Sequence, residues 1–312
     1  MAQRYSGTLP KPPTVLTVLT SPASESGRFS GGGRRAAYAL VMFLISIFVV
    51  TVVLYVANGR QLPVDIVDRL RDLIPNDETV SEQHLALSFL SGVLVAGTPF
   101  HTVVRYLSTV VHELGHAFTA GLLGGRPKNI TIATNGSGLA TYQPPITWGR
   151  FRATIVSLAG YPASPIAAIA AVQAAQGGHV KAWFAFSAGT LALAIVMLIR
   201  NFWGFLWTAG VVAASYFGAR ELDIKLLGLV VGGVAGYLAI QGLRDAWEQM
   251  TIVRFFPESF CDAEMVARWW KVDGKFVGFL HLSAVTALSG LATYLAVNPY
   301  WSEILDWTQK QF

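Results

Sequence analysis

The residues best suited to chemistry in this chain are His112, Glu113 and His116, within the sequence His-Glu-Leu-Gly-His. Two histidines four positions apart on a helix face the same direction, about one turn from each other. Both imidazoles can therefore bind one zinc ion, and Glu113 stands beside them as a base that takes a proton from water. This spacing predicts a zinc site of the hydrolytic kind.

The surroundings of the motif strengthen this interpretation. It lies within Val103 to Leu123, an apolar stretch long enough to cross a bilayer as a helix. Of the 18 acidic residues in the chain, Glu113 is the only one inside an apolar span. A carboxylate at membrane depth costs about 2.5 kcal/mol or more, which indicates a functional site.

Composition places the chain among polytopic membrane proteins. Hydrophobic residues make up 53% of its 312 residues and charged residues only 13%, against about 25% charged in a soluble domain. We attribute the net charge of +5 to cytoplasmic loops rather than to nucleic-acid binding. The single cysteine, Cys261, excludes an internal disulfide and a cysteine-built metal site.

The pattern predicts an all-α protein with about seven transmembrane helices and a small membrane-associated β-hairpin. Residues 1–35 are expected to be a disordered cytoplasmic tail, 36–84 a first span with an extracytoplasmic segment, 85–297 the core, and 298–312 a short C-terminal tail. The predicted spans are Ala36 to Val56, the motif helix, Ala153 to Ala175, Ala182 to Ile199, Phe202 to Ala219, Leu226 to Leu243 and Phe276 to Val297.

Two shorter segments need separate interpretations. Leu85 to Gly97 is apolar but too short to cross alone, so it is either re-entrant or a tilted start of the motif helix. Residues 129–142 alternate around Asn135-Gly136, which predicts a β-hairpin. The charge pattern orients these segments. Fifteen Lys and Arg fall on one side of the predicted membrane and seven on the other, which puts the N-terminus in the cytoplasm.

A catalytic zinc needs a third protein ligand and an open position for water. Candidates on the same side as the end of the motif helix are Asp245, Asp262 and Asp273, with His281 as a weaker fourth. His101 is about 16 Å before His112 by helical rise, too far to share the ion. The residues alone leave this choice open.

A resemblance to a known family narrows the choice. The stretch from Val111 to Gly125, VHELGHAFTAGLLGG, resembles the site-2 protease family of intramembrane zinc metallopeptidases, especially its compact bacterial branch without a PDZ domain. Other similar features lie between about residues 100 and 290: the Asn-Gly-Ser-Gly hairpin, Leu158-Ala-Gly-Tyr161, Arg200-Asn201-Phe202 with Gly204, and Cys261-Asp262-Ala263, which looks like the branch's Ser-Asp-Ala signature.

The resemblance implies His112 and His116 as ligands, Glu113 as general base and a distant Asp as third ligand. The Asn-Pro…Leu-Asp-Gly motif that usually supplies this Asp is missing, and Val272-Asp273-Gly274 matches only its end. We therefore favour Asp262, with Asp245 and Asp273 as alternatives.

The resulting hypothesis is an intramembrane zinc metalloprotease of a bacterial cell membrane, acting on single-span membrane proteins. Asn135 and Gly136 are expected to bind an unwound substrate segment through the hairpin. Asn201 is expected to assist at the reacting carbonyl. The main rival is a non-proteolytic scaffold or zinc-binding regulator that kept the fold. A metal transporter would need more intramembrane His and Asp than this single cluster.

Overall fold

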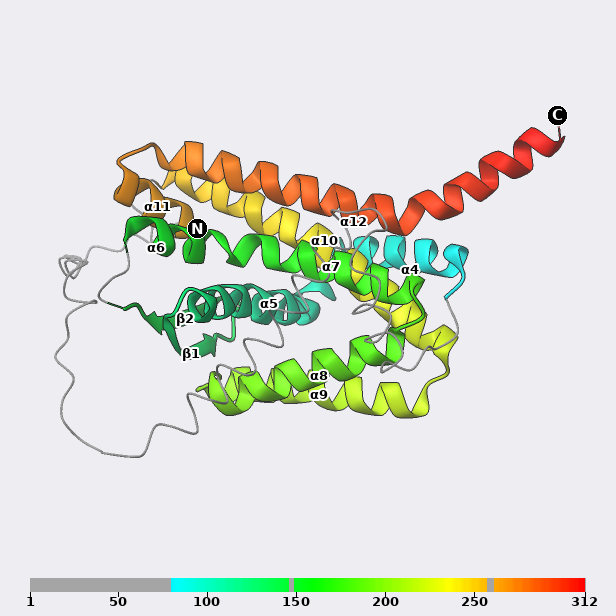
Figure 1. The fold of residues 1–312 in the computed structure, drawn as a ribbon, viewed down its shortest axis with the longest axis horizontal. Helices are drawn as coiled ribbons and strands as arrows, with labels where there is room; N and C mark the ends of the chain where they lie inside the picture. The colour runs from blue at the N-terminus through cyan, green and yellow to red at the C-terminus, as the bar shows by residue number, and fades with distance from the viewer. Residues whose placement is uncertain (1–79, 146–148, 257–260, 312) are drawn as a thin grey trace, which may run out of the picture.

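The computed structural model describes residues 80–145, 149–256 and 261–311, with side chains as far as Trp301. Helices dominate, and one antiparallel hairpin interrupts them (Figure 1). The predicted tail and the first predicted span, Ala36 to Val56, lie outside the described residues. The elements are α4 Glu82–Val95, α5 His101–Leu122, β1 Arg126–Ile132, β2 Gly138–Gln143, α6 Arg150–Leu158, α7 Gly160–Gln176, α8 Val180–Met197, α9 Phe202–Glu221, α10 Ile224–Phe255, α11 Asp262–Trp270 and α12 Gly274–Gln311.

Four described helices are long and apolar enough to cross a membrane: α8, α9, α10 and the Gly274–Trp301 part of α12. The predicted span Ala153 to Ala175 consists instead of two helices, α6 and α7, which bend by 51° and would make a fifth crossing as a pair. The motif helix α5 has 22 residues but is not among the four. The total of seven spans therefore stays a prediction.

Helix α10 forms the centre of the packing, with α4, α7 and α12 around it. It continues to Phe255, beyond the predicted end at Leu243, because the polar residues after Leu243 keep contacts inside the protein. Helix α4 has 14 residues, about 21 Å of helix, so it cannot cross alone. It packs on α10 through glycines. A Cβ at Gly92 would collide with the backbone of Gly233, and one at Gly236 with the backbone of Phe89.

The predicted hairpin is confirmed as strands β1 and β2. The outer edge of β1 is held by the segment after α8: the amide of Ile130 donates to Leu198 O at 2.8 Å, and the amide of Arg200 donates to Ile130 O at 3.2 Å. Asn201 extends this edge, since its Nδ2 donates to Ile132 O at 2.6 Å and its Oδ1 accepts from Ile132 N at 3.1 Å. One edge of the sheet is therefore closed. Among the described residues no third strand pairs with the other edge, along β2, which we call the free edge.

Candidate metal centre

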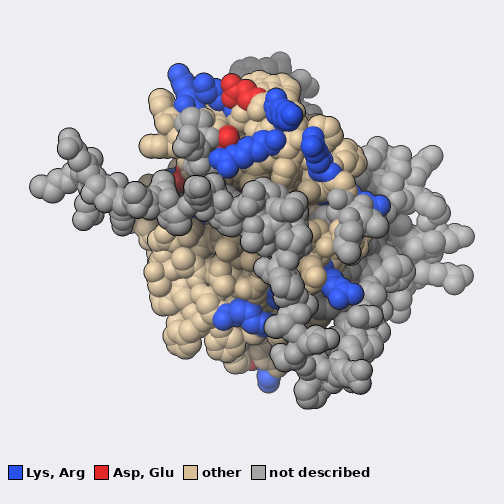
Figure 2. All heavy atoms as spheres, turned by 90° about the vertical axis from the view of Figure 1, so that its left-hand side faces the viewer, with Lys and Arg blue, Asp and Glu red and all other residues tan. Residues whose placement is uncertain are grey.

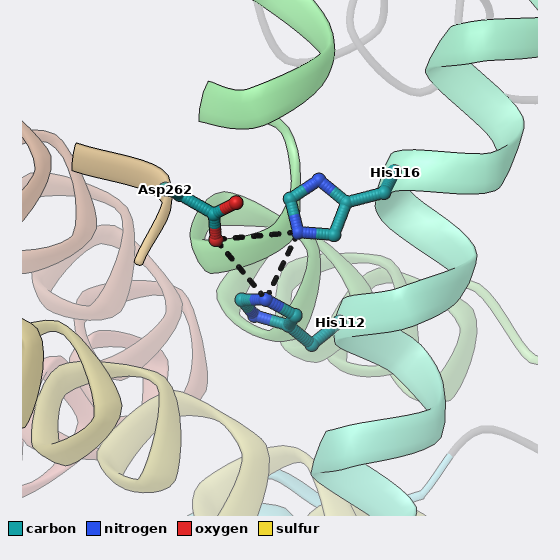
Figure 3. A group of neighbouring side chains, drawn as sticks. All are labelled: His112, His116 and Asp262. Atoms are coloured by element: carbon teal, nitrogen blue, oxygen red, sulfur yellow. Dashed lines mark hydrogen bonds and ion pairs between the residues drawn. The ribbon is translucent and has the colours of Figure 1, made fainter. Parts of the chain in front are cut away.

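Three side chains from two distant segments meet at the motif helix (Figure 3). His112 Nε2 and His116 Nε2 lie 3.1 Å apart, and Asp262 Oδ2 lies 3.4 Å from His116 Nε2 and 3.7 Å from His112 Nε2. Tetrahedral zinc ligands at about 2.1 Å from the ion stand about 3.4 Å from one another. The three donor atoms therefore have the separations that one zinc ion requires.

Gly160 leaves open the space beside these donors. A Cβ at this position would lie 2.6 Å from His112 Nε2 and even nearer to His116 Nε2. Any larger residue would thus fill the volume in front of both ring nitrogens. The open cradle and the donor set of two imidazoles and one carboxylate fit a zinc ion.

The orientation of the two imidazoles is set by their neighbours. His116 Nδ1 donates to the carbonyl of Val156 at 2.7 Å, which leaves Nε2 free to face the centre, an arrangement typical of metal-binding histidines. The ring of Tyr161 meets the ring of His112 edge to face, with centroids 4.7 Å apart. Gly115 lets α5 approach the bend between α6 and α7, since a Cβ there would be 2.8 Å from Ala159 O.

Asp262 is the first residue of α11, where Cys261 stands as N-cap. Burial opposes ionisation of Asp262, but its polar contacts with the rings of His112 and His116 outweigh it and hold the pKa of this carboxyl below its usual range. Asp262 is thus present as a carboxylate, the form that binds metal.

The other candidate ligands lie outside this group. Asp245, on α10, accepts from Gln241 Nε2 at 2.8 Å and from Ser108 Oγ at 3.3 Å. Asp273 is exposed and accepts from the amide of Lys275 at 2.8 Å at the start of α12. His281 is buried against Gln249, with 2.6 Å between Nδ1 and Oε1. The arrangement therefore favours Asp262 among the residues considered from the sequence.

Glu113 lies between the two histidines and the free edge of β2. Its side chain is buried, and the amide of Ala140 donates a hydrogen bond to it. The backbone N–H and C=O of Ala140 point away from β1. Its partner Ile130 bonds to Leu198 and Arg200 on the opposite edge, so the two residues form a pair without hydrogen bonds between them. Gly138 permits the close approach, since a Cβ there would lie 2.6 Å from Glu113 Oε1.

The predicted substrate residues occupy two different places. Asn135 and Gly136 form the hairpin turn, where Asn135 Oδ1 accepts from Ser137 N at 3.0 Å and Gly136 has φ 81°. The carbonyl of Gly136 accepts from Thr109 Oγ1 at 2.7 Å, so the turn rests on α5. Both polar groups of the Asn201 side chain are bonded to Ile132 on the closed edge. In this structure Asn201 supports the hairpin and does not face the metal centre.

The sequence reasoning did not find four residues that shape the site: Gly138, Ala140, Val156 and Gly160. Val156 and Ala140 act through backbone groups that every residue carries, so no side-chain type marks them. Gly160 and its neighbour Tyr161 were part of the resemblance, without a role.

Comparison with known proteins identifies the family. The model of the Peptidase M50B-like family matches residues 85–292, which is most of the chain, and the chain therefore belongs to that family. It is a multi-pass membrane protein of metallopeptidase type. Neither a search of curated proteins nor a search of solved structures gave a match.

Proposed function

We propose that this protein is an intramembrane zinc metalloprotease of the site-2 type, which hydrolyses peptide bonds in or near the transmembrane segments of other membrane proteins. One observation carries the proposal: three donor atoms with metal-ligand separations converge beside a buried glutamate. The alternative, a scaffold or zinc-binding regulator with this fold, needs no base at that position.

We assign His112, His116 and Asp262 as the ligands and Glu113 as the general base. Zinc, when bound there, supplies the Lewis-acid chemistry that makes water nucleophilic near neutral pH. Glu113 accepts the proton of the attacking water and passes it to the leaving amine. The hydrogen bond from the amide of Ala140 keeps the Glu113 carboxylate directed at the site during both transfers.

We propose that the free edge of β2 binds the substrate. A transmembrane helix hides its peptide bonds in internal hydrogen bonds and must unwind before it is cut. An unwound segment can pair with the edge as an added strand, which uses backbone groups and demands little of the side chains. This fits single-span membrane proteins as substrates, cut during regulated intramembrane proteolysis.

We further propose seven spans, with the N-terminus in the cytoplasm of a bacterial cell. The fifteen-to-seven distribution of Lys and Arg supports this orientation. It is tested by placing single cysteines at Lys225 and Lys271 in a Cys261→Ser background. An impermeant thiol reagent added to intact cells should label the first cysteine and spare the second, and the reverse pattern would invert the topology.

The variant Glu113→Gln distinguishes the protease hypothesis from the scaffold hypothesis. This change removes the base, keeps nearly the same volume and alters none of the assigned ligands. Zinc content should stay at the wild-type level, while cleavage of a tagged single-span substrate in proteoliposomes should fall about 10²- to 10⁴-fold. A Glu221→Gln variant, at the exposed end of α9, serves as control. Undiminished cellular function of Glu113→Gln would favour the scaffold.

A further inference from the structure

A group of exposed cations lies at the end of the molecule that carries the metal centre. Arg150 and Arg152 stand on α6, Lys271 follows α11, and Lys275 is near the start of α12. We call these four residues the basic rim. None of them forms an ion pair with another described residue. Figure 2 shows Lys and Arg side chains gathered on this end.

The acidic side chains nearby neutralise only a part of the rim. Glu264 pairs with Arg268 at 3.5 Å. The exposed Asp273 accepts from the neutral amide of Lys275 and keeps its charge, so it offsets one of the four cations. Asp262 is turned inward to the two histidines. The rim therefore presents a net positive surface.

Large aromatic side chains are exposed among these cations. Phe151 stands between the two arginines and is 66% exposed, and Trp270 immediately precedes Lys271 and is 48% exposed. Phe276, beside Lys275, is 56% exposed. Aromatic rings next to Lys and Arg are typical of the level where a membrane's headgroups meet its hydrocarbon. This mixture fits a lipid surface better than a soluble anion.

Lys271 adds an observation of its own. It is the C-cap of α11 and has φ 55°, the left-handed conformation that glycine adopts most easily. A lysine here is strained by comparison, and strain of this kind is found where a side chain has a function. This position therefore carries a cation where glycine would be the easier residue.

The elements of the rim also build the metal centre. Trp270 Nε1 donates to Thr154 Oγ1 at 2.7 Å, which ties the end of α11 to α6. Helix α6 supplies the Val156 carbonyl that orients His116, and α11 begins at Asp262. A ligand that bridges α6 and α11 therefore acts on both of these parts.

We infer that the basic rim binds the phosphate headgroups of anionic phospholipids, and that this binding holds α6 and α11 together and so tightens the His112–His116–Asp262 centre. Each Lys or Arg near an anionic surface contributes attraction that is lost when the lipid is neutral. The inference rests on the proposed metal site, and its readout is zinc affinity rather than cleavage alone.

The test compares zinc affinity in nanodiscs of pure phosphatidylcholine with nanodiscs containing about one third phosphatidylglycerol. We expect zinc to bind about tenfold tighter with the anionic lipid, within the usual range of coupling between two sites. The variant Arg150→Gln/Arg152→Gln/Lys271→Gln/Lys275→Gln should abolish this difference and keep helical content. Arg220→Gln/Lys225→Gln, at the α9–α10 turn, should retain it.

A second variant keeps the test valid if the fourfold variant fails to fold. Lys271→Gly relieves the strained cap, so it should be at least as stable as wild type and still lose part of the lipid effect. Equal zinc affinity in both lipids, or a lipid effect that survives the fourfold variant, would overturn the inference. So would soluble glycerol phosphate acting as well as the lipid. Absence of cleavage in every lipid, with the zinc effect intact, would refute only the proposed protease function.

Discussion

Gly160→Ala gives a direct test of whether the space between the two imidazoles is a metal site. The added Cβ would lie 2.6 Å from His112 Nε2, whereas ordinary contacts begin at 3.4 Å. The ring of His112 must therefore move by about 0.8 Å. The distance between a metal ion and its ligand atom varies by only about 0.2 Å in well-formed sites. We expect zinc affinity to fall by about 100-fold or more, at or beyond the upper end of losses for changes next to a ligand.

The same substitution should affect the metal-free protein in the opposite direction. Gly160 has no positive φ, so alanine suits its backbone. Replacing glycine restricts the unfolded chain, which raises the free energy of unfolding by about 0.4–1 kcal/mol. Without an ion the far ends of the two side chains are not fixed by a common ligand, so they can shift away from the new methyl group while His116 Nδ1 keeps its bond to Val156 O. We expect the metal-free variant to unfold at a temperature no lower than wild type.

Zinc affinity is measured by competition with a chromophoric chelator, and stability by thermal unfolding of chelator-treated protein. Gly189→Ala on α8 is the matched control, because a Cβ there meets nothing within 4 Å. If Gly160→Ala binds zinc like wild type and stays folded, the two Nε2 atoms do not share an ion there, and the site as proposed fails.

Further predictions concern the carboxylates and the hairpin. Asp262→Asn should lose zinc, since a neutral amide is a poorer ligand, whereas Asp273→Asn should keep it and lose at most about 1 kcal/mol of helix capping; metal analysis of both variants decides the third ligand. Asp245→Asn should also keep zinc, because Asp245 lies outside the donor group, and loss of metal there would reassign the ligand. Gly138→Ala should retain zinc but cut the cleavage rate about 100-fold by displacing β2 from the base, as single-turnover assays would show.

The sequence was most informative where spacing alone defines geometry. The i, i+4 relation of His112 and His116 predicted two rings on one helix face, and alternation around Asn135-Gly136 predicted the hairpin. Asp262 was chosen among several carboxylates by resemblance, because its distance in sequence says nothing about its distance in space. Its position depends on how α11 packs on α6, which local pattern does not encode.

Other features depended on packing between helices. The span predicted from Ala153 to Ala175 bends between α6 and α7, next to Gly160, where α5 approaches closely. Asn201 looked available for chemistry because its sequence position gave no sign of the two hydrogen bonds to Ile132. A polar side chain at a membrane edge can serve either the reaction or the scaffold, and only its contacts distinguish them.

The amide of Ala140 has a consequence for where a substrate would be cut. Along β2, Gly138 and Ala140 point their backbone groups to the free edge, since they alternate with residues paired to β1. The Ala140 amide already donates its hydrogen bond to Glu113, so this one donor is not available to an added strand. If a substrate strand pairs with this edge as proposed, its peptide bond opposite Ala140 would lie beside Glu113. A slip of one residue in this pairing turns every substrate side chain to the other face. The register of the added strand, rather than a sequence motif, would therefore determine which peptide bond is cut.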